Sequence, residues 1–128
     1  MSFLDAYKHL EQECGEVIHD GRKVTAYIEE MESIHDGAKM VKGWDDDLAK
    51  LKYYRRLRNE LAHNPDASER KLVKGSDIKW VRAFYKRLKK GKDPLSLYGK
   101  KTRRKGALWL LLILLAAVVA AVYFLFLR

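Results

Sequence analysis

The chain has 128 residues, which is enough for one small domain of about 100 residues and a short further segment. Its one cysteine, Cys14, excludes an intrachain disulfide and favours a reducing compartment. The net charge of +9 is poor evidence for a nucleic-acid-binding protein, because residues 89–106 hold eight basic residues and one acid, whereas residues 1–88 sum to only +1.

Two amphipathic helices are expected in the first third of the chain. Apolar residues recur at three- and four-residue spacing over residues 3–19, which predicts one apolar helix face. The same spacing follows Gly21 and runs over residues 24–34. It continues through residues 40–41 if the helix tolerates Gly37.

A third helix is expected between Gly43 and about His63. Three acids, residues 45–47, stand at its start, where they suit the positive end of the helix dipole. Asn64 precedes Pro65 and is therefore pushed away from helical geometry, so the helix ends at His63.

A loop over residues 64–76 separates this helix from a fourth, for which Ser76 is a plausible N-cap. Apolar residues at helical spacing extend the fourth helix to about Leu88. No segment has a convincing strand pattern. The sequence therefore predicts an all-α, four-helix bundle over residues 1–90.

A basic tether, residues 91–106, follows the bundle, and we expect Leu95, Leu97 and Tyr98 to order part of it. An apolar segment, residues 107–127, comes next. The apolar segment has 21 positions without a charge, and at about 1.5 Å per residue a helix of this length crosses the roughly 30 Å of a bilayer's hydrocarbon core. A buried core helix is the alternative, but such helices are shorter and carry a polar stripe. We expect a transmembrane helix.

The flanking charges predict the orientation of this helix. Basic residues next to a span stay on the cytoplasmic side, and the N-terminal sequence is amphipathic and acidic rather than signal-like. We therefore expect a tail-anchored protein with a cytoplasmic domain, a single span and contact with the lipid bilayer. The residues that set this topology are Lys100, Lys101, Arg103, Arg104 and Lys105.

Arg58, Asn59 and His63 crowd the end of the third helix. Asn59 and His63 are four residues apart and share a face, whereas Arg58 lies roughly 140° from His63 around the axis. The arginine and histidine converge only if the last turn unwinds or if a second copy of the helix approaches across a two-fold axis.

The run Arg58-Asn59-Glu60-Leu61-Ala62-His63 resembles the Arg, polar residue, three residues, His signature of HEPN domains, small helical bundles that include many metal-independent endoribonucleases. The resemblance implies a homodimer in which both copies of the motif line one composite cleft. It also implies an RNA substrate and a role as a toxin or a stress or antiviral defence effector.

These residue types suit RNA cleavage without a metal. Histidine titrates near neutral pH and can move protons at the 2'-hydroxyl or at the leaving 5'-oxygen, so His63 is the candidate acid or base. Arg58 can offset negative charge on the phosphate, and Asn59 can orient the imidazole or bond to the phosphate. The expected products carry 2',3'-cyclic phosphate and 5'-hydroxyl ends. No metal-ligand spacing or phosphate-binding glycine loop is present, so we expect no cofactor.

Simpler interpretations stay open. A histidine in a last helical turn suits the helix dipole, and Arg58 can belong to a solvated basic face. Residues 1–47 hold 5 basic and 12 acidic residues and residues 48–88 hold 12 and 4, an asymmetry that either joins two halves of the bundle or creates a positive surface around Arg58. The alternative function is a non-catalytic, tail-anchored helical module that binds a protein partner or RNA.

Overall fold

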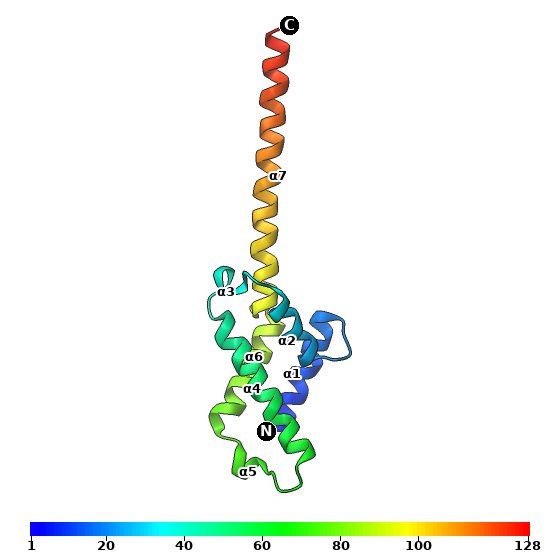
Figure 1. Cartoon of the computed structure of the whole chain (residues 1–128), viewed down its shortest axis with the longest axis vertical. Coiled ribbons are helices and arrows are strands. Elements are labelled where there is room, and N and C mark those ends of the chain that lie inside the picture. The colour runs from blue at the N-terminus through cyan, green and yellow to red at the C-terminus, as the bar shows by residue number, and fades with distance from the viewer.

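The computed structural model describes residues 1–128 and contains helices but no strand, so the predicted all-α class is confirmed (Figure 1). Four helices form a bundle, two single-turn helices lie in its connections, and a long last helix extends away from it. In chain order the helices are α1 (Phe3–Ile18), α2 (Val24–Ser33), α3 (Gly37–Met40), α4 (Trp44–His63), α5 (Glu69–Leu72), α6 (Gly75–Lys89) and α7 (Pro94–Phe126).

The core lies between α1, α2, α4 and α6. Helix α1 packs along α6, and α2 packs against both α1 and α4. The core is rich in aromatic residues, whose rings contact one another across helices, as Phe3 does with Tyr54 and Tyr27 with Phe84. Burial of such large side chains is the main favourable term that holds a small bundle together.

The second predicted helix is divided in two. Helix α2 ends at Ser33, and a separate turn, α3, begins at Gly37. A Cβ atom at Gly37 would lie 2.2 Å from the indole ring of Trp44, so the close packing of α3 on the start of α4 requires a glycine there. Gly43, with φ of 80°, then provides the left-handed turn into α4.

Helix α6 begins slightly earlier than predicted and is capped differently. Ser76 is not the N-cap, because the helix starts at Gly75 with Lys74 in the N-cap position. The side chain of Asp77 reaches back and accepts a hydrogen bond of 2.8 Å from the Lys74 backbone N–H. Asp77 also accepts from the Tyr54 hydroxyl over 2.9 Å, so one carboxylate caps α6 and joins it to α4.

The segment predicted as a tether is helical instead. Helix α7 runs without a break from Pro94 to Phe126, with Asp93 as N-cap and its side chain accepting from the Ser96 backbone N–H. Because the Tyr98 ring contacts the Trp44 ring at a tilt and the Tyr98 hydroxyl donates a hydrogen bond to Asp36, the first turns of α7 are part of the bundle. The domain and the apolar segment are therefore joined by a continuous helix rather than by a flexible linker.

The apolar part of α7 is long and apolar enough to span a membrane. Large apolar side chains from Leu108 to Leu127 are exposed along its length. No other helix lies beside this part of α7 (Figure 1). Helix α4 runs away from this apolar helix, so its C-terminal end lies at the opposite end of the bundle (Figure 1).

Candidate functional site

The guanidinium of Arg58 lies half-exposed beside α1. Its Nε is 3.7 Å from Oε1 of Glu11, with exposed side-chain fractions of 37% for Arg58 and 22% for Glu11. One terminal nitrogen, Nη1, donates to Oδ1 of Asn59 over 3.3 Å. A single long ion pair and a long hydrogen bond leave most of the five donors of the guanidinium free for an anion.

His63 is exposed at the last position of α4, and its ring forms no hydrogen bond or ion pair. The helix does not unwind before it, because the Asn64 backbone N–H still bonds to the Glu60 carbonyl at 3.0 Å. Of the two ways to bring Arg58 and His63 together, unwinding is thus excluded within this chain. The side chain of Asn59 forms a hydrogen bond with Arg58 and none with His63.

The turn after the motif is built by Asn64. Its Nδ2 donates to Glu60 Oε1 over 2.6 Å, and its Oδ1 accepts from the Asp66 backbone N–H over 3.0 Å. The chain then enters α5, where Glu69 accepts a hydrogen bond of 2.7 Å from the Phe3 backbone N–H at the start of α1. These contacts fix the loop close to the motif.

A tyrosine lies beneath the arginines of α4. Burial raises the pKa of Tyr7 well above its ordinary value, and the negative charge of Glu11 adds to this effect. The positive charges of Arg58 and Arg55 act in the opposite direction and lower the pKa of Tyr7.

None of the five main cavities in one copy of the chain lies at the motif. The five main cavities are lined by other residues, and none is lined by Arg58, Asn59 or His63. A cleft at this position would therefore need a surface from another molecule. Such a surface would also keep water away from the reacting groups, which an open site cannot do.

One of the acids at the start of α4 has a further role. Both carboxylate oxygens of Asp47 bond to Arg87 of α6, at 3.1 and 2.8 Å, in a two-point ion pair. This ion pair joins the acidic part of the chain before residue 48 to the basic part after it. The charge asymmetry therefore helps to hold two halves of the bundle together, which is the first of its two predicted roles. Sequence reasoning missed this pair because the partners are 40 positions apart.

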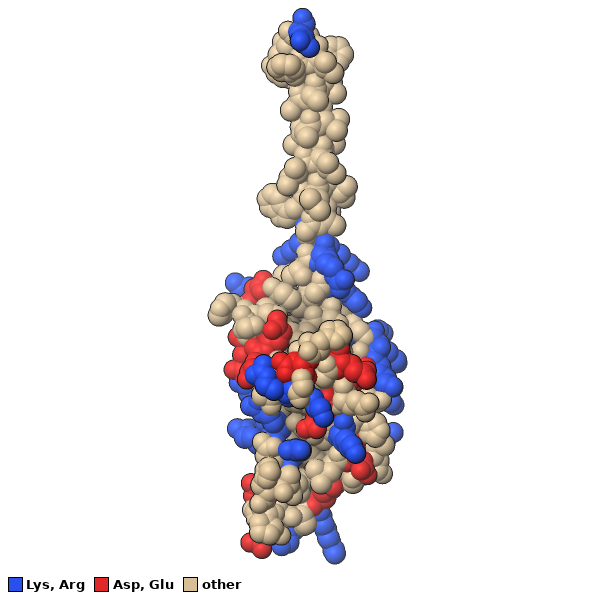
Figure 2. Space-filling view, turned by 90° about the vertical axis from the view of Figure 1, so that its right-hand side faces the viewer, with Lys and Arg blue, Asp and Glu red and all other residues tan.

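The basic residues assigned to membrane topology surround the base of the exposed apolar helix, where Figure 2 shows blue side chains at the neck of the molecule. Two of them also fasten α7 to the α3 region: Lys101 donates to the Met40 carbonyl and Lys105 approaches the Met40 sulfur. Positive charge is thus held at one end of the apolar part of α7.

The site and fold describe an all-α protein with an exposed Arg-Asn-His group at one end and an apolar helix at the other. Over residues 1–109 the sequence matches the family described as "Family of unknown function (DUF6548)", and the chain belongs to that family. No curated protein and no solved structure matches the chain. Any functional inference therefore depends on the residues themselves.

Proposed function

We propose that this chain is a membrane-anchored, metal-independent endoribonuclease of the HEPN type that acts as a homodimer. The observation that carries the proposal is the exposed His63 ring, free of protein partners, on the same helix end as a half-exposed Arg58.

In the proposed reaction the 2'-hydroxyl of the RNA attacks the adjacent phosphorus. Either His63 accepts the hydroxyl proton and water protonates the leaving 5'-oxygen, or water takes the hydroxyl proton and His63 protonates that oxygen, as the P–O5' bond breaks. Arg58 binds two oxygens of the phosphate and offsets the charge that grows on them, and Asn59 orients the guanidinium through its Oδ1. The products carry 2',3'-cyclic phosphate and 5'-hydroxyl ends.

The ion pair between Arg58 and Glu11 is weak enough for RNA to displace it. Pairs this exposed contribute about 0–1 kcal/mol at most, and the N–O distance of 3.7 Å is long. A phosphate that binds two guanidinium nitrogens is the stronger partner.

A second copy of the chain supplies the missing wall of the cleft. Two α4 ends related by a two-fold axis bring the His63 of one protomer towards the Arg58 of the other, which one helix cannot do by itself. The domain lies on the basic, cytoplasmic side of the membrane in this proposal. Confinement of both copies to a bilayer raises their effective concentration.

The non-catalytic module is the second candidate. Two observations favour it: the pairing of Arg58 with Glu11 on its own chain, and the absence of a main cavity at the motif. In this case the domain at the far end of the rigid helix α7 recruits a partner.

A cleavage assay separates the two candidates. The full chain in detergent micelles is incubated with mixed-sequence RNA in excess EDTA, and product ends are identified. The endoribonuclease predicts cyclic phosphate ends and a loss of about 100-fold or more in His63→Ala and Arg58→Ala. His35→Ala and Arg56→Ala, which change exposed residues of the same types, are matched controls with full activity. A folded, dimeric chain that does not cleave RNA would favour the module.

A mixing experiment tests the two-copy arrangement. If each site takes Arg58 from one protomer and His63 from the other, a dimer of one Arg58→Ala and one His63→Ala chain keeps one intact site. Random pairing then restores roughly a quarter of wild-type activity. No restoration, with exchange of protomers verified, would contradict the pairing of residues across the dimer.

A further inference from the structure

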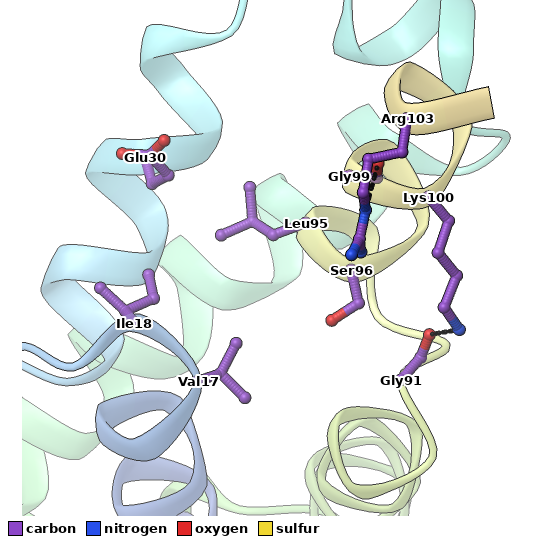
Figure 3. Close-up of a pocket in the computed structure, with 9 residues that line it drawn as sticks. All are labelled: Val17, Ile18, Glu30, Gly91, Leu95, Ser96, Gly99, Lys100 and Arg103. Atoms are coloured by element: carbon purple, nitrogen blue, oxygen red, sulfur yellow. Dashed lines mark hydrogen bonds between the residues drawn. The ribbon is translucent and has the colours of Figure 1, made fainter. Parts of the chain in front are cut away.

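A cavity of about 590 Å³ lies at the base of the apolar helix, on the opposite end of the bundle from the proposed ribonuclease site. Figure 3 shows its walls, which come from the end of α1, from α2 and from the first turns of α7. Val17, Ile18 and Leu95 provide apolar surface, whereas Arg103, Ser96 and Glu30 provide polar groups. Nothing in the ribonuclease proposal uses this cavity.

Arg103 is held in place with its terminal nitrogens free. Its Nε donates to the Gly99 carbonyl over 3.2 Å, which turns the side chain back along α7 (Figure 3). The two terminal nitrogens form no hydrogen bond or ion pair, and the Ser96 hydroxyl at the same wall has no partner either. A guanidinium with free terminal nitrogens on the same wall as a free hydroxyl is suited to a phosphate group.

Two glycines also line the cavity. Gly99 lines the cavity, and a Cβ at this position would have only Arg103 within 4 Å, at 3.8 Å. Gly91 accepts a hydrogen bond of 3.0 Å from Lys100, which keeps a second positive charge at the cavity while two of its three protons stay free. Glu30 has no partner on the opposite wall, so it can accept hydrogen bonds from hydroxyl groups.

The cavity lies next to the position that the headgroup layer would take if the apolar segment spans a bilayer. Arg103 is four residues before the apolar segment, a rise of about 6 Å along α7, and each headgroup layer is roughly 5–8 Å thick. Helical side chains point towards the N-terminus, so the guanidinium lies just beyond this layer, on the side of the domain. A headgroup that projects from the membrane surface reaches it.

We propose that this cavity binds the headgroup of an anionic phospholipid of the phosphatidylglycerol type. Arg103 and Ser96 take the phosphodiester, with Lys100 adding positive charge, and Glu30 accepts hydrogen bonds from the headgroup hydroxyls. Free phosphate compounds share the phosphate chemistry, but the position beside the membrane span favours the lipid.

Calorimetric titration of the full chain in neutral detergent micelles tests this proposal. The probe is short-chain phosphatidylglycerol, with short-chain phosphatidylcholine and inorganic phosphate as comparisons. Saturable binding of phosphatidylglycerol is expected, weakened about tenfold or more in Arg103→Gln and in Gly99→Leu, which fills the cavity. Neither change removes a core contact of the bundle.

Matched controls separate a built site from a diffuse basic surface. Arg104→Gln removes the same charge one position along, and Gly106→Leu adds the same side chain where no atom lies within 4 Å. Both should bind phosphatidylglycerol like the wild type. Equal weakening in Arg104→Gln, absence of saturable binding, or equally tight binding of inorganic phosphate would each overturn the proposal.

Discussion

The hydroxyl of Tyr27 donates a hydrogen bond of 2.5 Å to Oδ2 of Asp93, and both residues are fully buried. Tyr27 lies on α2 and Asp93 is the N-cap of α7, so this bond joins the bundle core to the start of the helix that carries the apolar segment. The Tyr27 oxygen also accepts from the Leu95 backbone N–H over 3.1 Å. The other carboxylate oxygen, Oδ1, has no partner.

Removal of the Tyr27 hydroxyl should destabilise the fold clearly. Tyr27→Phe takes the strongest partner from a buried carboxylate, so we expect a loss of about 1–3 kcal/mol in the free energy of unfolding. Tyr98→Phe is the control, because its hydroxyl bonds to Asp36 at an exposed position where water can replace it. Chemical denaturation of both variants measures the difference, and equal losses would contradict a special role for the buried bond.

The sequence predicted the helices of the bundle better than the base of α7. Helical spacing of apolar residues is a local signal, and it placed α1, α4 and α6 correctly to within a few residues. Residues 91–106 were predicted as a polar tether that Leu95, Leu97 and Tyr98 partly order. A continuous helix was not predicted, because the partners that hold Asp93 and Tyr98 are more than 60 positions away. Such partners leave no local pattern.

The candidate site shows the same limit. The sequence placed Arg58, Asn59 and His63 at a helix end, and the 140° separation followed from helical geometry alone. The pairing of Arg58 with Glu11 and the cavity at Arg103 depend on how α1 packs against α4 and α7. Three-dimensional packing decides these features, so sequence spacing did not predict them.

Alkaline pH should unfold the bundle. Burial, and then the negative charges nearby, raise the pKa of Tyr27 and Tyr54 above the ordinary 10.0. The folded chain keeps these protons where the unfolded chain releases them, so stability is unaffected below pH 10.0 and falls as the pH rises above it. Denaturation midpoints across this range measure the effect. Tyr54→Phe should reduce the slope, whereas Tyr53→Phe, which changes an exposed ring, should leave it unchanged.

A methyl group at Gly37 should disturb the packing of α3. In Gly37→Ala the new Cβ would lie 2.2 Å from the Trp44 ring, so the ring or the turn must move. We expect a loss of about 1–3 kcal/mol in stability and a change in Trp fluorescence. Gly75→Ala places the same group in open space and should change stability by no more than about 0.5 kcal/mol. A neutral Gly37→Ala would mean that α3 does not pack on Trp44 as described.

The Cys14 thiol should react only when the bundle opens. Its side chain has an exposed fraction of 0%, and burial, followed by the charge of Asp93, raises its pKa well above the ordinary value. At about pH 8 the native chain should therefore react with a thiol reagent at least about 1,000-fold more slowly than in denaturant. Ser33→Cys in a Cys14→Ala background places the thiol at an exposed position and should react at the rate of a free thiol. If Cys14 reacted as fast as this control, the helices around it would not form the closed core described here.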